Sequence, residues 1–356
     1  MRPDRILYLK TDDVRLACAG LDPLAAIRDV LIRHATGEAI LPSETYMAWS
    51  PDDISKPPGG ATAGNLETTR SLGMPGLVLR PRPIVGTKII NASIANVRVG
   101  LPRASGLTLL FDFYTARPVC ILEAATISAL RTASVTIVAA ELLHEQPIVT
   151  AALIGAGTQA SAHLELFLSS FPQLSEVRVF DHHPSRASAL HESHAAGSRA
   201  SDVTLVVAES ARAAIEGAEL VVTVTTTTEG YIPFDWLSPG TTLVNVSLDD
   251  PLPDVVFRAG TLVIDDWQLI SSDTRRLLGR LYHEGLVCGP DVVAGDGIRK
   301  VDATLGDLLL GRHPGRRDPG EVVLVNPFGM AIEDLALGHL VYEFAASTGL
   351  GMWLAV

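Results

Sequence analysis

The chain has 356 residues, 47% hydrophobic and 19% charged, which suits roughly two domains with large apolar cores. Its net charge of −12 argues against nucleic acid or an anionic membrane as the main partner. Cys18, Cys120 and Cys288 lie far apart and predict neither a disulfide framework nor a metal site. The N-terminal segment lacks the apolar region of a signal peptide, and no apolar run reaches about 18 residues, so we expect a cytoplasmic protein without a membrane span.

The first third of the chain predicts strands with some helix. Apolar residues recur at helical spacing over residues 21–36. Residues 51–63 are rich in Pro and Gly, which is typical of an exposed loop. Residues 76–91 predict two short strands, and residues 106–123 predict a β-hairpin. A long helix with one apolar face is expected at 124–144.

From residue 148 the pattern changes to strands that alternate with helices such as 158–171 and 209–217. Buried, β-branched strands in this arrangement are typical of an α/β fold with a doubly wound parallel sheet. An amphipathic helix is expected near the C-terminus, at 330–346. The predicted strands are 148–155, 177–181, 203–209, 220–226, 241–247 and 261–266.

A glycine-rich turn joins the first of these strands to the helix that follows it. The turn reads G-x-G-x-x-A, an accepted form of the dinucleotide-binding fingerprint. Gly155 permits the tight turn, Gly157 lets a pyrophosphate approach the backbone, and Ala160 lets the helix pack on the strand. The helix N-terminus offers N–H groups to the phosphates. The expected cofactor-binding residues here are Gly155, Ala156, Gly157, Thr158, Gln159 and Ala160.

An acidic residue ends the next predicted strand. Asp181 lies 21 residues after Ala160, where a carboxylate accepts hydrogen bonds from the adenosine ribose and repels a 2′-phosphate. The sequence therefore favours NAD over NADP in a Rossmann domain. The neighbouring His182 and His183 could suggest a metal, but a loop on the adenosine side explains them better, and we expect no metal.

A few polar residues are not explained by a nucleotide fold. Lys88 lies in an apolar run, where it either extends to solvent or pairs with an anion. Arg131 lies early in the long helix, where a solvated side chain is the simplest interpretation. Asp249 and Asp250 end a predicted strand, at the edge that faces the cofactor in doubly wound sheets, although two acids there can also form a solvated turn.

Several segments, in order along nearly the whole chain, resemble the ornithine cyclodeaminase/μ-crystallin family. The resemblance implies a substrate and dimerisation domain of α+β type at 1–130 and 325–356 around an NAD domain at 146–320, in a homodimer. The matching segments are KIIN at 88–91, GLPRASGLTLLFD at 100–112, ISALRTASVTIVAAELL at 127–143, GAGTQA at 155–160 and NPFGMAIEDLA at 326–336.

Within the family, the chain resembles the subgroup that makes L-2,3-diaminopropionate for siderophores or antibiotics. The resemblance implies NAD-dependent oxidation of N-(2-amino-2-carboxyethyl)-L-glutamate, followed by hydrolysis to L-2,3-diaminopropionate and 2-oxoglutarate. The matching segments are RASG at 103–106, YIPFDWL at 231–237, VIDDW at 263–267 and MAIEDLA at 330–336.

The resemblance also implies roles for single residues. Lys88 matches a lysine that binds the substrate carboxylate and takes part in catalysis, and Arg131 matches an arginine at the substrate and cofactor site. Asp250 matches a catalytic aspartate, although Asp249 is one position away. Arg103 stands where cyclodeaminases have threonine, which favours a substrate with more carboxylates. Further cofactor-binding residues are expected at Arg131, Thr132, Asp181, Thr225 and Ser247.

One departure from the family concerns residues 41–47, which lack the usual basic residue. Arg80, Arg82 or Arg98 could supply the missing cation. Three alternatives to the dehydrogenase stay open. They are an ornithine cyclodeaminase, a ketimine reductase or alanine dehydrogenase that works toward the amine, and a non-catalytic binding protein of the μ-crystallin kind.

Overall fold

A computed structural model describes residues 5–49, 69–80, 82–144, 146–195 and 202–355, so the expected loop at 51–63 lies outside the described residues. The chain divides into two compact units. Unit 1 comprises residues 1–131 and 330–356, and unit 2 comprises residues 132–329. The division falls inside helix α4 (Ala124–Leu143).

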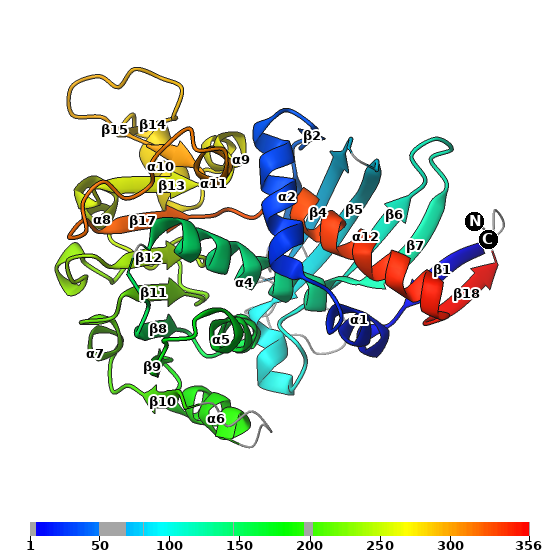
Figure 1. The fold of residues 1–356 in the computed structure, drawn as a ribbon, viewed down its shortest axis with the longest axis horizontal. Coiled ribbons are helices and arrows are strands. Elements are labelled where there is room, and N and C mark those ends of the chain that lie inside the picture. The colour runs from blue at the N-terminus through cyan, green and yellow to red at the C-terminus, as the bar shows by residue number, and fades with distance from the viewer. Residues whose placement is uncertain (1–4, 50–68, 81, 145, 196–201, 356) are drawn as a thin grey trace. The chain divides into compact units, whose positions relative to one another are not determined.

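Unit 1 is built on one mixed sheet with the strand order β18-β1-β7-β6-β5-β4-β2, in which β3 also pairs with β4 (Figure 1). Strands β1 and β7 are parallel, and the other pairs are antiparallel. The strands are β1 (Arg5–Leu9), β2 (Ala39–Ile40), β3 (Thr45–Trp49), β4 (Thr69–Val78), β5 (Ile84–Ser93), β6 (Ala104–Phe111), β7 (Pro118–Glu123) and β18 (Met352–Ala355).

Helix α12 (Ala331–Thr348) packs on β4, β5 and β6, and α1 (Thr11–Cys18) and α2 (Pro23–Ala35) pack on α12. A Cβ atom at Gly86 in β5 would lie 2.8 Å from Leu335 Cδ2, so the glycine allows the helix to approach the sheet closely. This approach seats the first turn of α12 against the sheet. The 3₁₀ helix η3 (Ile94–Val99) joins β5 to β6.

Unit 2 is built on a parallel sheet with the order β10-β9-β8-β11-β12-β17-β13-β16, which confirms the predicted doubly wound α/β fold. Strand interiors such as those of β11 and β12 are fully buried. The strands are β8 (Thr150–Ile154), β9 (Glu176–Phe180), β10 (Thr204–Val207), β11 (Leu220–Thr223), β12 (Thr242–Asn245), β13 (Thr261–Ile264), β16 (Ala303–Thr304) and β17 (Val323–Asn326), and β14 (Val287–Cys288) pairs with β15 (Arg299–Lys300).

Helices connect the strands of unit 2, and its core gathers their apolar side chains together with those of the strands. The helices are α5 (Thr158–Ser170), α6 (Pro184–Ala195), α7 (Ala211–Ile215), η4 (Phe234–Trp236), α8 (Pro253–Arg258), α9 (Trp267–Ser272), α10 (Leu277–His283) and α11 (Leu305–Leu309).

The structure differs from the sequence-based expectations in two respects. Residues 325–329 were expected with the substrate domain, but β17 pairs with β12 and β13 and therefore belongs to unit 2. The helices expected to have one apolar face are buried on several sides: residues 132–140 of α4 are all buried, as are residues 331–335 of α12.

Helix α4 is also long and apolar enough to cross a membrane by length and composition alone. However, 72% of its apolar window is buried inside the protein, as expected for a core helix.

Candidate functional site

The glycine turn of unit 2 has the geometry that its sequence predicts. Gly155 has a φ of +105°, and a Cβ atom there would lie 2.9 Å from the Val224 carbonyl oxygen, so only glycine fits without strain. A Cβ atom at Gly157 would meet nothing within 4 Å. The backbone at Gly157 is therefore open to a ligand.

Helix α5 begins directly after this turn. Its N-cap residue, Gly157, offers no side-chain hydrogen bond to the first turn. The N–H groups of that turn and the helix dipole thus point at the open space, as in a phosphate site. Ala160 is fully buried, as close packing of helix on strand requires. These residues fit the pyrophosphate of a dinucleotide.

Asp181 does more than the sequence pattern predicts. Its Oδ2 accepts a hydrogen bond from Ala156 N at 2.9 Å, and its Oδ1 accepts one from His183 N at 2.8 Å. The carboxylate therefore braces the glycine turn from the end of the neighbouring strand. His182 and His183 are exposed, and no cluster suited to a metal exists among the described residues.

A hydrogen-bonded group surrounds Asp250 in the same unit. Thr225 Oγ1 lies 2.9 Å from Asp250 Oδ1, and Tyr231 OH lies 3.0 Å from the same oxygen. The Ser247 hydroxyl bonds Oδ2. Thr225 and Ser247, expected at the cofactor, thus both contact the predicted catalytic aspartate. Burial raises the pKa of Asp250, and the hydroxyls of Thr225 and Tyr231 oppose the rise.

The polar group continues along the sheet into residues that the sequence analysis missed. Ser247 Oγ lies 2.8 Å from Thr223 Oγ1, which lies 2.7 Å from Asn245 Oδ1. Asn245 Nδ2 donates to Asn326 Oδ1 at 2.7 Å. Three polar residues that end buried strands were the available signal, but their contact depends on the strand order.

The structure distinguishes the two adjacent acids. Asp249 Oδ1 accepts a hydrogen bond from Leu277 N at 3.0 Å and pairs with Arg280 Nη1 at 3.1 Å, so it anchors the start of α10. Asp250 instead contacts the hydroxyls of Thr225, Tyr231 and Ser247. Leu248, just before them, has a φ of +81°, a strained conformation for leucine that costs about 1–3 kcal/mol. Such strain is typical of functional loops.

A cluster of buried charges lies in unit 1. Lys88 Nζ bonds Asp334 Oδ2 at 2.6 Å and lies 3.5 Å from Ser128 Oγ. Arg131 Nη1 bonds Glu333 Oε2 at 2.9 Å, and its Nε lies 3.3 Å from Asp334 Oδ2. Lys88 is 1% exposed, and both carboxylates are fully buried. Two expected substrate-binding cations are thus brought together, each with an acidic partner.

The acidic partners were missed although their sequence signal was present. Glu333 and Asp334 are two consecutive acids within the apolar segment that begins α12. Burial lowers the pKa of Lys88, the Arg131 charge adds to this, and Asp334 opposes it. Glu44 also acts on Lys88 electrostatically. Residues 41–47, which lack the basic residue that is usual in the family, therefore contribute an acidic residue near Lys88.

Arg103 and Arg82 lie apart from Lys88 and Arg131. Arg103 is half-buried before β6, and its carbonyl accepts a hydrogen bond from Ser93 N. It lies five residues from Thr108, which faces Lys88 across the strands, or about 17 Å along an extended strand. Arg82 pairs with Glu343. The side chain of Arg98 lies outside the described residues.

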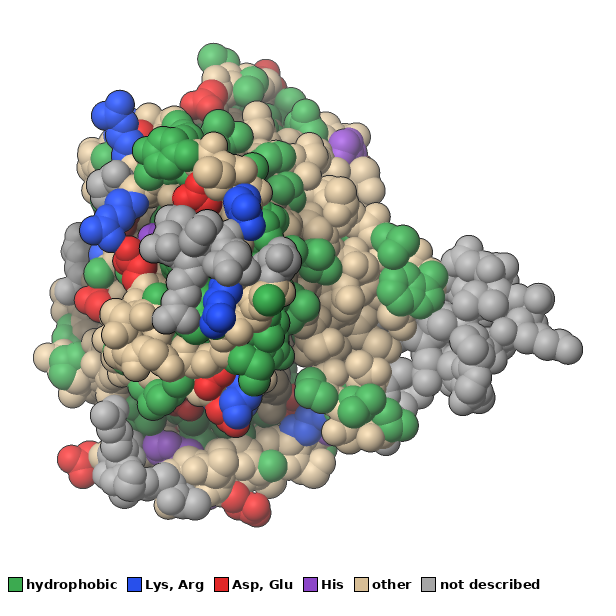
Figure 2. Space-filling model, turned by 90° about the vertical axis from the view of Figure 1, so that its right-hand side faces the viewer, with side chains coloured by type: hydrophobic (Ala, Val, Ile, Leu, Met, Phe, Trp, Pro, Cys, Tyr) green, Lys and Arg blue, Asp and Glu red, His purple; other side chains and the backbone are tan. Residues whose placement is uncertain are grey.

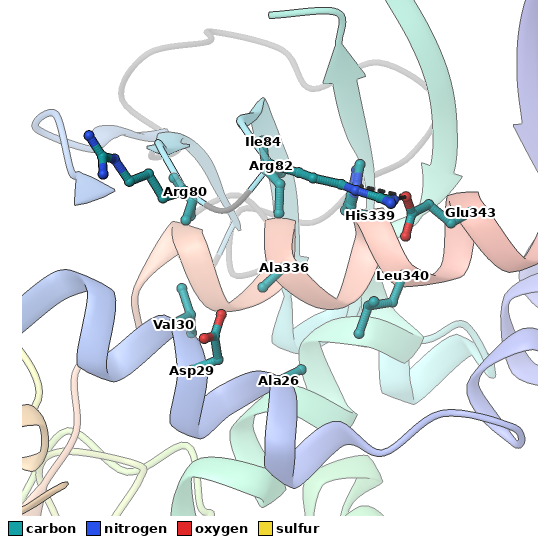
Figure 3. A pocket seen from close by; sticks show the side chains of 11 residues that line it. Ala26, Asp29, Val30, Arg80, Arg82, Ile84, Ala336, His339, Leu340 and Glu343 are labelled. Carbon is teal, nitrogen blue, oxygen red and sulfur yellow. Dashed lines mark hydrogen bonds and ion pairs between the residues drawn. The ribbon is translucent and has the colours of Figure 1, made fainter. Parts of the chain in front are cut away.

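A cavity of about 290 Å³ also lies in unit 1, but it is lined by other residues. It lies beside α2 and α12, with an apolar floor that includes Val30, Ala336 and Leu340 (Figure 3). Arg82 extends toward Glu343 beside His339, whereas Arg80 points away. The candidate site residues Lys88 and Arg131 do not line this cavity.

Comparisons with known proteins agree with this arrangement. A profile described as "Ornithine cyclodeaminase/mu-crystallin family" matches residues 44–349. The chain is 29% identical to N-((2S)-2-amino-2-carboxyethyl)-L-glutamate dehydrogenase of Staphylococcus aureus over 98% of both chains. It is 26% identical to mouse ketimine reductase mu-crystallin over 72% of this chain and 75% of that protein. The crystal structure of CmnK matches with a TM-score of 0.86 and 38% identity over 99% of both chains.

Proposed function

The chain belongs to the ornithine cyclodeaminase/mu-crystallin family, and from this premise we propose that it oxidises N-(2-amino-2-carboxyethyl)-L-glutamate with NAD. The products would be L-2,3-diaminopropionate and 2-oxoglutarate. The chain is an NAD-dependent enzyme that acts on an amino-acid-derived substrate. The observation that carries the finer proposal is the similarity to the Staphylococcus aureus dehydrogenase along nearly the whole of both chains.

We assign the substrate carboxylates to the cations of unit 1. A lysine ammonium carries three donors, of which Asp334 and Ser128 take two from Lys88. The planar guanidinium of Arg131 suits a carboxylate, which it can bind through two parallel hydrogen bonds. Because Glu333 and Asp334 hold both side chains in place, the cations are oriented before a substrate arrives.

Unit 2 provides the cofactor site and a group that handles protons. Bound NAD supplies the acceptor for the hydride that leaves the glutamate Cα. Asp250 takes the proton from the secondary amine, which leaves an imine. Asp250 then orients the water that adds to the imine carbon. The C–N bond breaks with the proton returned to the departing amine, and an oxo acid remains.

The direct test is incubation of the protein with N-(2-amino-2-carboxyethyl)-L-glutamate and NAD. We expect NADH absorbance to rise with an equal amount of L-2,3-diaminopropionate, identified by mass spectrometry. Lys88→Met should raise the KM for this substrate while the binding of NAD, followed by fluorescence, stays the same. Arg15→Met, which removes an exposed cation of α1, is the matched control.

Other outcomes of the same assay would contradict the proposal. Proline formed from ornithine without net NADH would indicate a cyclodeaminase. NADH consumption with a cyclic imine or with pyruvate and ammonia, without oxidation of the proposed substrate, would indicate a reductase. NAD binding without turnover of any of these compounds would indicate a binding protein.

We also propose a homodimer that uses the sheet of unit 1. Lys88 and Thr108 face α12, so their neighbours Ile89 and Leu107 face the other side of the sheet, where they are 40% and 44% exposed. Met352 is 61% exposed at the sheet edge. Figure 2 shows this end of unit 1, where hydrophobic side chains lie among charges of both signs. Such a face suits a second copy of the chain.

Light scattering tests the dimer. Leu107→Lys should shift the molar mass toward that of a monomer, whereas Val293→Lys, at an exposed position of unit 2, should not. A monomeric wild-type protein at micromolar concentration would contradict the proposal.

We further propose that the reaction serves the synthesis of a siderophore or antibiotic precursor in the cytoplasm. The three cysteines, Cys18, Cys120 and Cys288, are free thiols, which suits a reducing compartment.

A further inference from the structure

The carboxyl ends of three neighbouring strands carry a row of buried polar side chains. Thr223 of β11 is in register with Asn245 of β12, and Asn326 follows Val325, the partner of Val244 in β17. Side chains in register on parallel strands point to the same face of the sheet. Thr223, Asn245 and Asn326 are 0%, 0% and 3% exposed, so their hydrogen bonds are made with one another and with Ser247.

The number of protons in this row sets the direction of each hydrogen bond. The amide of Asn245 donates to Asn326, so its oxygen faces Thr223. The single hydroxyl proton of Thr223 therefore goes to Asn245, and Thr223 can only accept from Ser247. Ser247 then donates its only hydroxyl proton to Thr223.

The contact between Ser247 and Asp250 Oδ2 consequently needs a proton from Asp250. A protonated Asp250 donates to Ser247 through Oδ2 and accepts from Thr225 and Tyr231 through Oδ1. Each contact from Asp250 through Ser247, Thr223 and Asn245 to Asn326 then joins one donor to one acceptor. An ionised Asp250 would accept a hydrogen bond from Ser247, and Ser247 and Thr223 would then face each other at 2.8 Å without a hydrogen between them.

We propose that Thr223 and Asn245 are positioning residues that act through Ser247 to favour the protonated form of Asp250. This inference rests on the proposed function only for its consequence in catalysis. An ionised Asp250 would have matching partners only if every hydrogen bond of the row reversed its direction, with the amides of both Asn245 and Asn326 turned over. The row thus biases Asp250 toward the acid form.

Burial and a neighbouring charge act on Asp250 in the same direction as the row, whereas the hydroxyls of Thr225 and Tyr231 favour the ionised form. Burial raises the pKa of Asp250, and the neighbouring Asp249 charge raises it further. Asp249 is paired with Arg280. Arg276 Nη1 lies 3.5 Å from the backbone carbonyl of Ser247. Tyr231, which bonds Asp250, has its own pKa raised mainly by burial.

A consequence for the reaction follows from this bias. Asp250 must lose its proton before it can take one from the substrate amine, so turnover should increase with pH as Asp250 ionises. When Asp250 accepts the amine proton, it returns to its protonated form, which the row stabilises. Proton return to the departing amine would then be the step that the row opposes.

The test compares two buried threonines of unit 2. Thr223→Val removes the hydroxyl that binds the Ser247 proton, so Ser247 can donate to Asp250 and the acidic limb of the kcat profile should move to lower pH. One hydrogen bond corresponds to a shift of about one pH unit. Thr241→Val removes a hydroxyl that bonds the Ala218 carbonyl at the other end of β12. Thr241→Val should leave the acidic limb of the kcat profile in place. Thr223→Ser, which keeps a hydroxyl, should hold the limb at its wild-type pH.

A second readout does not depend on turnover. The infrared spectrum of the wild-type protein minus that of Asp250→Asn should contain the carbonyl band of a protonated carboxylic acid at neutral pH. In the Thr223→Val background this band should disappear at lower pH than in wild type. If the protein failed to oxidise the proposed substrate, the band would still decide the inference.

Two results would overturn the inference. One is an Asp250 band that shows only carboxylate from pH 5 to pH 8. The other is a titration that Thr223→Val and Thr241→Val move equally, which would mean that loss of packing rather than the hydrogen-bonded row causes the change.

Discussion

Units 1 and 2 bury ionisable groups in different ways. In unit 1, Lys88 and Arg131 are balanced by Asp334 and Glu333, within 3.3 Å in each pair. In unit 2, the side-chain partners of Asp250 are the hydroxyls of Ser247, Thr225 and Tyr231. One cluster keeps its charges by pairing them, whereas the other surrounds a carboxyl group with neutral dipoles.

The difference has a physical consequence for each cluster. The ion pairs of unit 1 fix the positions of the paired side chains. Removing one member of such a buried pair leaves an uncompensated charge and destabilises the protein. A carboxyl group held by neutral hydroxyls can gain or lose its proton with less disruption. Unit 1 therefore suits the binding of charged groups, and unit 2 suits proton transfer.

The largest expected effect is on kcat and concerns Asp250, the proton-transfer residue proposed in unit 2. Asp250→Asn should lower kcat by about 10²- to 10⁴-fold, because the group that accepts the amine proton is lost. Steady-state kinetics with NAD and the proposed substrate measure it. Asp249→Asn is the matched control, and it should reduce stability through Leu277 and Arg280 with kcat changed by less than about tenfold. The reverse order of effects would assign the role to Asp249.

A substitution at Asp334 would disrupt the buried ion pairs of unit 1. Asp334→Asn should destabilise the protein by about 3–5 kcal/mol, because Lys88 and Arg131 lose the charge that both contact. Urea unfolding followed by circular dichroism measures the change. Glu343→Gln removes the partner of the exposed Arg82 and should cost only about 0–1 kcal/mol. Equal losses in both variants would show that the buried cluster has no special role.

A buried histidine tests how unit 2 tolerates a charge. His163 Nδ1 donates to the Gln159 carbonyl, and Nε2 faces Thr136 Oγ1 at 2.9 Å. Burial lowers the pKa of His163 from 6.5 to about 4. Below pH 6.5 the unfolded state therefore takes up the proton first, and stability falls as the pH falls, by about 3 kcal/mol at pH 4.

Unfolding measured between pH 7 and pH 4 should show that decline, with a smaller slope in His163→Gln. His144, whose pKa burial also lowers to about 4, accounts for a further part of the slope. A slope that His163→Gln leaves unchanged would contradict a neutral His163.

The smallest effect is expected at Asp181. Asp181→Asn should weaken NAD binding by about tenfold, since the variant loses the charge that braces Ala156 N and that we assign to the ribose. The ratio of kcat/KM for NAD to that for NADP should fall. Glu192→Gln, on the exposed side of α6, removes one charge without touching the turn and should leave the ratio as it is.

The nucleotide half of the site could be predicted from local sequence. Gly155, Gly157, Ala160 and Asp181 lie within 27 residues of one another, and their roles follow from one strand, one turn and one helix. Local backbone geometry suffices there because every partner is near in the chain. The parallel sheet could be predicted for the same reason, from apolar strands that alternate with helices.

The partners of Lys88, Arg131 and Asp250 required the tertiary structure. Asp334 is 246 positions from Lys88, and Asn326 is 81 positions from Asn245, so no local pattern joins them. The sequence alone determined which residues carry charge and which strands are buried. The folding of α12 onto the sheet of unit 1 and the strand order of unit 2 decided which of those charges are neutralised, because burial makes an ionisable group depend on whatever the fold places beside it.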